Sequence, residues 1–343
     1  MIIDNPKKIK EVEIVVGIPS YNEAKTIGFV VEQASLGLEK YFPNKKSVII
    51  NLDNNSTDGT KEVFFEAKAS ISRIYVSTQK DIKGKGYNFH NLFLMLEKLG
   101  AKVGIVIDAD LRSVKPDWIK KMIKPVLGGY DFITPYYARS KTDATITNHL
   151  VYPLIYGLLG WDIRQPIGGD FAFSDKMVKI WLKQEWNPTT YQFGIDIFMT
   201  LTAIFEKMKI AQVNLGTKIH NSSISKLSNM FYQVTSTLFE LILKNRDKIE
   251  KKIKIKKSLI LGEKKLPSLG LKGIPQIEVK KIDLESWTKA VYDSLVVYSG
   301  NKDVIKKLGD LYLTRLTLLE SEKDVKKQAE YFFKQREYFL KRI

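Results

Sequence analysis

Short apolar runs alternate with stretches of helical apolar spacing along the first 110 residues, and the two patterns predict different elements. The runs EIVVGI at 13–18 and SVIINL at 47–52 are rich in β-branched residues and predict buried strands. Between them, apolar residues at helical spacing predict a helix over 26–38. Strands that alternate with helices are typical of an α/β domain with a mostly parallel sheet. Further strands are predicted at 74–77 and 103–107, and further helices at 60–69 and 84–98.

The apolar pattern becomes looser after residue 138 and changes again near residue 235. An apolar run at 151–161 contains one Pro and two Gly and is shorter than the ~20 residues needed to span a bilayer, so we expect it in the core or in a pocket wall. We therefore expect three regions, 1–138, 139–234 and 235–343. In the middle region the pattern predicts a turn at 168–170, a helix at 196–207 and a strand at 213–215.

The last region is basic. Its pattern predicts a basic amphipathic helix at 239–255, a loop rich in Gly and Pro at 261–275, and Lys-rich helices at 284–343. It carries 25 basic and 15 acidic residues, which supply +10 of the formal net charge of +17. Such an excess suggests a nucleic acid, an anionic membrane or a phosphorylated small molecule as partner, or else a solvated Lys-rich surface. Because the region has no recognised nucleic-acid-binding motif, we expect no nucleic-acid partner.

Composition narrows the possible chemistry. The 343 residues include no cysteine, which excludes disulfides, zinc–thiolate sites, iron–sulfur clusters and thiol nucleophiles. Hydrophobic residues make up 44% and charged residues 27%, the balance of a globular protein rather than of a disordered chain. The first ten residues lack the apolar stretch of a signal peptide, so we expect a soluble, cytoplasmic protein.

Two carboxylates, Asp108 and Asp110, follow the predicted strand at 103–107. Carboxylates two residues apart at a strand end can both reach one divalent cation, and Mg²⁺ and Mn²⁺ prefer oxygen ligands. Most pairs with this spacing lie in surface loops, so the pair alone is a weak signal. Its setting strengthens the prediction, because parallel α/β sheets bind ligands at the carboxyl ends of their strands.

Further polar clusters follow the first two predicted strands. Pro19, Tyr21 and Glu23 come after the first strand and could hold a base and a ribose. Asp53 and Asn54 begin the cluster DNNSTDGT after the second strand. This second cluster can equally form a turn and cap the next helix, so a structural role and a binding role both stay open.

The loop KGKG at 83–86 opens a predicted helix, where Lys85 could face a phosphate, although a flexible basic turn is also possible. As a set and in this order, IPSYNE, DNNSTDGT, KGKG and IDAD resemble the nucleotide-sugar domain of GT-A glycosyltransferases. The resemblance implies an α/β fold of GT-A type, with a Rossmann-like, mostly parallel sheet flanked by helices. It also implies a divalent cation, Mg²⁺ or Mn²⁺, that holds the diphosphate leaving group on the two aspartates.

Two segments of the middle region narrow the resemblance. QPIGGD at 165–170 and AQVNLGTKIH at 211–220 resemble segments of the glucosyl-3-phosphoglycerate synthases, the retaining enzymes of glycosyltransferase family 81. The resemblance covers about 12–234 and implies a hexosyltransferase in which His220 completes the metal site. A single histidine is otherwise more often a core or surface residue than a ligand.

The resemblance also assigns roles to the three regions and to individual residues. Region 1–138 would bind the nucleotide sugar, 139–234 would bind the acceptor, and 235–343 would serve dimerisation or capping. The implied residues are Pro19, Tyr21, Glu23, Asp53, Asn54, Lys85 and Asp108 for the nucleotide sugar, Thr147, Gly168, Gly169, Asp170, Lys218 and Ser222 for the acceptor, Asp108, Asp110 and His220 for the metal, and Lys85, Asp110 and Asp196 for catalysis.

The acceptor site departs from the family pattern at 144–147. Where the family has a Gly-Arg pair and a Thr that bind the phosphate of phosphoglycerate, this chain has ATIT, so Thr147 matches the Thr and the Arg is missing. A Thr hydroxyl does not replace the bidentate fork of Arg. Either another base takes over, with Arg139, Lys141 and Arg164 nearest, or the acceptor lacks that phosphate, as glycerate or another small polyol acid does.

We therefore expect metal-dependent transfer of glucose or mannose from UDP-glucose or GDP-mannose to a small acidic acceptor such as 3-phosphoglycerate or glycerate. The resemblance implies retention, with the acceptor hydroxyl attacking from the face of the leaving group and a β-phosphate oxygen taking its proton. We also expect a homodimer. The alternative is a peripheral membrane GT-A transferase that acts on a polyprenyl phosphate or another lipid and docks through its basic helices.

Overall fold

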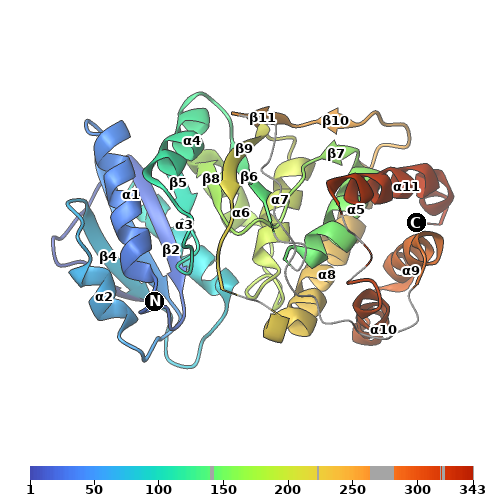
Figure 1. Cartoon of the computed structure of the whole chain (residues 1–343), viewed down its shortest axis with the longest axis horizontal. Coiled ribbons are helices and arrows are strands. Elements are labelled where there is room, and N and C mark those ends of the chain that lie inside the picture. Colours follow the sequence, from blue (N-terminus) through green and yellow to red (C-terminus); the bar gives the residue numbers. More distant parts are fainter. Residues whose placement is uncertain (140–142, 222–223, 263–281, 317, 319–320, 343) are drawn as a thin grey trace.

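A mixed β-sheet runs through the computed structural model, which describes residues 1–139, 143–221, 224–262, 282–316, 318 and 321–342. The strands are β1 (Ile2–Asp4), β2 (Ile14–Ser20), β3 (Ser47–Asp53), β4 (Ser72–Ser77), β5 (Val103–Val106), β6 (Phe132–Ala138), β7 (Trp161–Asp162), β8 (Phe171–Ser174), β9 (Ile210–Thr217), β10 (Lys256–Lys257) and β11 (Leu259–Leu261). Within the described residues the main sheet has nine strands in the order β1-β4-β3-β2-β5-β8-β6-β9-β11 (Figure 1). In this sheet only β1 and β8 run antiparallel to their neighbours, which confirms the mostly parallel prediction.

Helices cover both faces of the sheet. They are α1 (Ile27–Tyr41), α2 (Thr60–Glu66), α3 (Lys85–Lys98), α4 (Pro116–Leu127), α5 (Tyr152–Leu154), α6 (Asp175–Lys183), α7 (Ile195–Phe205), α8 (Leu227–Lys244), α9 (Leu284–Val297), α10 (Lys302–Leu313) and α11 (Glu322–Leu340). Side chains alternate along each strand, so Ile14 and Val16 of β2 join a core with α1 and α4, whereas Val15 faces the opposite core. That opposite core contains α3, α7, α8 and the C-terminal helices.

The apolar run at 151–161 lies in the core, as predicted, but it is not a regular helix. Two π-helical turns, η1 (Thr147–Val151) and η2 (Ile155–Leu159), flank the short helix α5. Most of their side chains are buried, and α11 packs against α5 and η2. π-Helical turns are rare and occur frequently at functional sites.

The helix predicted at 239–255 is present only at 239–244, and the prediction is wrong for the residues after 244. Helix α8 ends at Lys244, and the chain then forms a 3₁₀ turn, η4 (Arg246–Lys248), before it becomes extended. The extended segment pairs through β10 with β7 and through β11 with β9. Both pairings lie just beyond residue 255, so the chain leaves the helix inside the predicted range to reach them, and tertiary structure overrides the helical spacing.

The region boundary expected after residue 234 falls inside α8. Phe231 and Val234, before that boundary, share a core with Trp287 and Tyr312 from α9 and α10. In addition, β11 extends the main sheet from the far side of the boundary. The described C-terminal helices therefore pack as part of the same unit as the middle region.

The carboxyl ends of β2, β3 and β5 lie side by side. Parallel pairing places Ser20 beside Asp53, and Gly17 beside Val106. The polar residues that follow these three strands consequently gather at one edge of the sheet, which is where ligands bind in folds of this kind.

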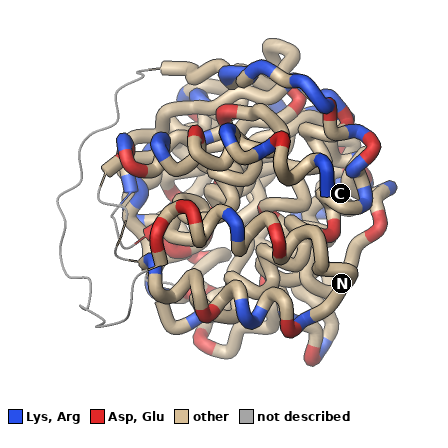
Figure 2. The backbone as a smooth tube through the Cα atoms, turned by 90° about the vertical axis from the view of Figure 1, so that its right-hand side faces the viewer, with Lys and Arg blue, Asp and Glu red and all other residues tan. Residues whose placement is uncertain are grey.

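Basic side chains are spread over the C-terminal side of the molecule. In Figure 2, which faces that side, Lys and Arg segments are interspersed with Asp and Glu segments over much of the view. In the described part of the chain, no helix is long and apolar enough to cross a bilayer.

Candidate active site

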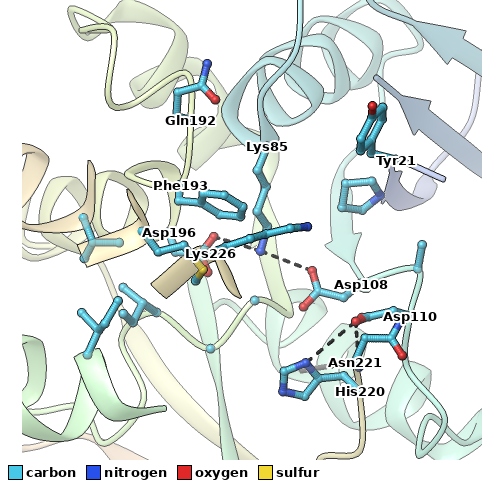
Figure 3. Close-up of a pocket in the computed structure, with 18 of the residues that line it drawn as sticks. Tyr21, Lys85, Asp108, Asp110, Gln192, Phe193, Asp196, His220, Asn221 and Lys226 are labelled. Carbon is cyan, nitrogen blue, oxygen red and sulfur yellow. Dashed lines mark hydrogen bonds and ion pairs between the residues drawn. The ribbon is translucent and has the colours of Figure 1, made fainter. Parts of the chain in front are cut away.

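A pocket of about 700 Å³ opens at the edge of the sheet where β2, β3 and β5 end. Most residues predicted for the site lie in its walls, although they come from segments far apart in the sequence (Figure 3). The predicted residues that line it are Pro19, Tyr21, Glu23, Asn54, Lys85, Asp108, Asp110, Thr147, Gly168, Gly169, Asp196, Lys218 and His220.

Asp108 lies between two lysines. The Nζ atom of Lys85 is 3.3 Å from Oδ1 of Asp108, and the Nζ atom of Lys218 donates a hydrogen bond of 2.9 Å to Oδ2. Burial opposes ionisation of Asp108, but the two ammonium groups hold its pKa well below the usual range. Asp108 is therefore a carboxylate, and its charge is largely balanced within the protein.

Lys85 also contacts Asp196, whose Oδ1 atom lies 3.4 Å from Nζ (Figure 3). Burial disfavours the charged form of Lys85, yet the carboxylates of Asp108 and Asp196 keep its pKa above the ordinary value. Burial raises the pKa of Asp196. Lys85 thus presents a permanent positive charge to the pocket from the first turn of α3.

Lys218 and Asp170 organise the pocket floor. Besides the bond to Asp108, Lys218 Nζ donates to the carbonyl of Gly168 at 2.9 Å and to Oδ2 of Asp170 at 2.8 Å. All three N–H donors of the ammonium are therefore used. Asp170 is fully buried, does not line the pocket, and also accepts from Tyr137 Oη at 2.7 Å. In this structure the polar groups of Asp170 and Lys218 bind other protein groups, and their role in acceptor binding stays a prediction.

Gly169 allows the Asp108 carboxylate to lie against the floor. Its φ of +88° is in the left-handed region, and a Cβ atom at this position would be 2.3 Å from Oδ2 of Asp108. Only glycine combines that backbone conformation with so close an approach. The role of Gly169 is therefore to admit a neighbouring side chain.

Asp110 and His220 lie close to each other in another part of the pocket wall. The Nδ1 atom of His220 is 3.8 Å from Oδ2 of Asp110, which also accepts from the backbone N–H of Asn221 at 3.0 Å (Figure 3). Nε2 of His220 lies 2.9 Å from Oδ2 of Asp143. The contact with Asp143 fixes the ring so that Nδ1 points toward Asp110, as carboxylates do for metal-ligating histidines.

Arg139 and Asp143 form an ion pair that sequence reasoning missed. Nε and Nη2 of Arg139 donate to the two carboxylate oxygens of Asp143 at 2.7 and 2.9 Å. Burial opposes the charge of Asp143, but Arg139 and the hydrogen bond from His220 hold its pKa well below the usual range. Both residues line the pocket. The i, i+4 spacing of opposite charges was the available signal, but the apolar pattern there predicted no helix.

Tyr21, Glu23 and Asn54 line the wall that follows β2 and β3. The hydroxyl of Tyr21 accepts a hydrogen bond of 2.9 Å from Lys83, whose ammonium also lies 4.6 Å from the centre of the ring. Burial raises the pKa of Glu23 to about 7, and the nearby carboxylate of Asp110 adds to the shift. Asn54 accepts from the backbone N–H of Gly84 at 3.2 Å. This wall therefore presents an exposed aromatic ring and polar groups to one side of the pocket.

Asp53 does not line the pocket. It is fully buried, and its carboxylate accepts from the hydroxyls of Ser20 at 2.7 Å, Ser56 at 2.6 Å and Tyr75 at 2.9 Å. It therefore ties the ends of β2, β3 and β4 together, and the structural role left open for its cluster is the one that the structure supports.

The glycines of KGKG admit a second segment of the chain. A Cβ atom on Gly86 would be 2.0 Å from the carbonyl oxygen of Thr190, and the N–H of Gly86 donates to the carbonyl of Gln192 at 3.1 Å. This close approach of two backbones requires glycine whether or not a phosphate binds nearby.

The remaining candidates near the acceptor side are differently placed. Thr147 is buried and lines the pocket. Arg164 does not line it, because its guanidinium is bound by both carboxylate oxygens of Glu322 at 2.7 Å. Ser222 and Lys141 lie outside the described residues.

The donor atoms suit a hard divalent cation. A carboxylate and an imidazole nitrogen, from Asp110 and His220, point into the same part of the pocket. Among the described residues no group of three or more His, Cys, Asp and Glu side chains surrounds one point. Two protein ligands with open positions fit Mg²⁺ or Mn²⁺, which commonly complete their coordination with water and substrate phosphates.

Comparison with known proteins shows which family the chain resembles. A family model described as the mannosylglycerate synthase GT domain matches residues 5–238. The glucosyl-3-phosphoglycerate synthase of Petrotoga mobilis is 27% identical over 259 residues, which cover 69% of this chain and 76% of that protein. The mannosylglycerate synthase of Rhodothermus marinus is 28% identical over 142 residues, which cover 39% of this chain and 35% of that protein.

Solved structures agree with the fold. The glucosyl-3-phosphoglycerate synthase of Mycobacterium tuberculosis, in complex with Mn²⁺, UDP and glucosyl-3-phosphoglycerate, superposes with a TM-score of 0.55 at 26% identity, covering 67% of this chain and 80% of that chain. A complex of the same enzyme with Mg²⁺ and UDP gives a TM-score of 0.54 at 26% identity, covering 67% and 79%. The predicted GT-A fold and the predicted resemblance are thus confirmed.

Proposed function

The chain belongs to the family of the mannosylglycerate synthase GT domain and is a glycosyltransferase of the glucosyl-3-phosphoglycerate synthase type, and from this premise we propose that it transfers a hexose from a nucleoside diphosphate sugar to glycerate. The related enzyme of M. tuberculosis binds UDP-glucose in one structure and phosphoglyceric acid in another. The pocket supplies a wall for each of two such substrates. The question that the geometry addresses is whether the acceptor carries a phosphate.

The Arg139–Asp143 ion pair is the observation that favours a non-phosphorylated acceptor. Asp143 immediately precedes the segment ATIT, where the family's phosphate-binding Arg is missing. Its carboxylate lies in the pocket wall and occupies the fork of Arg139. A phosphate dianion would be repelled by Asp143 and would compete with it for the guanidinium. Glycerate needs only a site for one carboxylate and two hydroxyls.

No other described arginine is available in the wall for that phosphate. Arg164 is held by Glu322 outside the pocket. The ammonium of Lys218 is bound by Asp108, Asp170 and a carbonyl, so it has no free donor. Thr145 and Thr147 line the same wall, and uncharged residues there would suit a small polyol acid.

On the donor side, Tyr21, Glu23 and Asn54 would bind the base and the ribose. Lys85 would face the diphosphate, because its positive charge reaches the pocket from the first turn of α3. Asp110 and His220 would hold a Mg²⁺ or Mn²⁺ ion. When bound, that ion would supply positive charge to neutralise the charge that develops on the leaving diphosphate. Asp108 would hold Lys85 in place and balance its charge within the pocket.

Retention of the anomeric configuration is the finer part of the proposal. The buried carboxylate of Asp196 is paired with Lys85, which favours a role in placing that lysine over one as a free base. The acceptor hydroxyl would then attack on the face of the departing diphosphate and transfer its proton to a phosphate oxygen. Proton NMR of the product's anomeric coupling tests this, since an inverted product would contradict it.

A matrix of donors and acceptors tests the proposed function. UDP-glucose and GDP-mannose are each paired with glycerate, 3-phosphoglycerate and a polyprenyl phosphate, with and without Mg²⁺ or Mn²⁺. We expect one donor to be used with glycerate only when the cation is present, with kcat/KM at least about tenfold above that for 3-phosphoglycerate, a difference of about 1.4 kcal/mol. Transfer to the polyprenyl phosphate alone would instead support the lipid-acceptor alternative.

A further inference from the structure

The C-terminal helices, which lie outside the matched range 5–238, contact the segment that forms the acceptor side of the pocket. We call residues 143–151 the acceptor segment; it comprises Asp143 to Ile146 and the π-helical turn η1. In Figure 1 the helices α9, α10 and α11 gather at the end of the molecule opposite β4. Side chains from all three reach the acceptor segment.

Tyr312 of α10 makes the contact closest to the pocket. Its hydroxyl lies 2.6 Å from the hydroxyl of Thr145, a pocket-lining residue, and both side chains are buried. The ring of Tyr312 stacks on Phe231 of α8, with centroids 4.4 Å apart and planes inclined by 19°. The stack fixes the position of the ring, so the hydroxyl is a rigid anchor for Thr145.

Gln328 and Trp287 hold the carbonyls of η1. The amide nitrogen of Gln328 donates to the carbonyls of Asn148 at 2.8 Å and His149 at 3.2 Å. The indole N–H of Trp287 donates to the carbonyl of His149 at 2.9 Å. Arg315 donates to Oε1 of Gln328 at 2.7 Å, which orients the amide so that its nitrogen faces η1.

The acceptor segment has a backbone that local preferences do not favour. Ala144 has a φ of 55°, in the left-handed region, and η1 follows three residues later as a π-helical turn. Such conformations cost about 1 kcal/mol or more and persist where the surrounding structure over-determines them. Here the surrounding hydrogen bonds come from residues more than 100 positions away in the sequence.

We propose that Tyr312 and Gln328 are positioning residues of the acceptor site. Through them the C-terminal helices hold the acceptor segment in one conformation, in which Asp143, Thr145 and Thr147 line the pocket. The effect on acceptor binding rests on the proposed function. Of the two roles predicted for the C-terminal region, dimerisation and capping, these contacts favour capping.

The variant Tyr312→Phe tests the proposal because it removes one hydroxyl and keeps the stack on Phe231. The matched control is Tyr292→Phe in α9, which also removes a buried hydroxyl, one that donates to the carbonyl of Phe332 at 2.8 Å within the C-terminal helices. Three quantities are compared in both variants and in the wild type: KM for the acceptor, KM for the nucleotide sugar, and hydrogen exchange of the backbone amides in 143–151.

We expect Tyr312→Phe to raise KM for the acceptor about tenfold, to leave KM for the nucleotide sugar unchanged, and to speed amide exchange in the acceptor segment. Tyr292→Phe should leave all three unchanged. Unaltered exchange and acceptor KM in Tyr312→Phe would overturn the proposal, and so would equal changes in the control, because these would indicate general loosening of the helices.

A second variant, Gln328→Met, removes the two amide donations at a different point and should again speed exchange in the acceptor segment. Unaltered exchange there in both Tyr312→Phe and Gln328→Met would overturn the positioning role without any activity measurement. If the wild type transfers no sugar to any acceptor, the proposed function fails, and amide exchange still decides whether the C-terminal helices hold the segment.

Discussion

The proposed donor wall of the pocket, residues 19–23, 54 and 83–85, and the acceptor segment are supported by different kinds of contact. Residues 19–23 and 54 continue from parallel strands that pair residue by residue. Residues 83–85 are held by backbone N–H groups, from Gly84 to the side chain of Asn54 and from the adjoining Gly86 to the carbonyl of Gln192. The acceptor segment combines a left-handed alanine with a π-helical turn and is held by side chains from α9, α10 and α11. Changes in the C-terminal helices of this chain would therefore act on the acceptor segment and leave the donor wall in place.

The largest effect is expected where the two sides meet, at Asp110. Replacing Asp110 by Ala removes one of the two proposed cation ligands, so we expect kcat/KM to fall by about 10²–10³-fold, comparable to the loss of one group that stabilises a developing charge. The control Asp117→Ala removes a surface carboxylate paired with Lys121 and should leave transfer unchanged. Full cation-dependent activity of the Asp110 variant would remove this residue from the site.

Rigidity of the backbone next to the donor wall is tested by Gly86→Ala. The added Cβ atom would overlap the carbonyl of Thr190, which is backbone and cannot turn aside, so we expect a loss of about 1–3 kcal/mol in the free energy of unfolding. Gly309→Ala is the matched helical control, because its Cβ atom would meet the Phe231 side chain at an ordinary 3.4 Å. Urea unfolding of both variants measures the difference, and equal stability would show that the two backbones can separate without cost.

Low pH should lower the free energy of unfolding through His149, which lies in the acceptor segment. Burial lowers the pKa of this residue to about 3, and the charge of Arg315 adds to the shift. The unfolded chain takes up a proton below pH 6.5 that the folded protein does not bind, so stability is unaffected above that pH and falls as the pH drops toward 3.

Between pH 6.5 and 5 the expected loss from His149 is about 1.6 kcal/mol, because the unfolded histidine is half protonated at pH 6.5 and the full slope of about 1.4 kcal/mol per pH unit is reached only at lower pH. His149→Phe removes the titrating group and should flatten this part of the stability profile. Urea unfolding at the two pH values measures the slope for wild type and variant, and identical slopes would contradict the account.

A smaller effect is expected for Asp143→Asn, which tests whether the acceptor side excludes phosphate by charge. The neutral amide would release the Arg139 fork, so the ratio of kcat/KM for 3-phosphoglycerate to that for glycerate should rise about tenfold, or 1.4 kcal/mol. Using the ratio cancels any common loss that arises because Asp143 also orients His220. An unchanged ratio would mean that this carboxylate does not select the acceptor.

The sequence predicted correctly those parts of the fold and the site that depend on local sequence patterns. The strands before Pro19, Asp53 and Asp108 were predictable because buried parallel strands are short apolar runs, and the polar residues that follow them necessarily meet at one edge. Their individual roles were less accessible. Asp53 and Asp170 are buried under the pocket by partners such as Tyr75 and Tyr137, and no local pattern distinguishes them from exposed carboxylates.

Sequence reasoning failed where distant residues decide the structure. Helix α8 ends at Lys244, before the predicted limit of 255, and the chain that follows it leads to β10 and β11, which pair with remote strands. The contact between Thr145 and Tyr312 joins residues 167 positions apart, and Tyr312 belongs to no motif. Such contacts are long-range and specific to one packing arrangement, so periodicity and propensity carry no information about them.

The most direct test of the central claim is a competition in one reaction. The wild-type protein is given its nucleotide sugar and Mg²⁺ or Mn²⁺ with equal concentrations of glycerate and 3-phosphoglycerate, and the two glycosylated products are separated by mass. Their initial ratio equals the ratio of the two kcat/KM values. We predict at least about ten molecules of hexosylglycerate for each phosphorylated product, equivalent to 1.4 kcal/mol; an excess of the phosphorylated product would contradict the account.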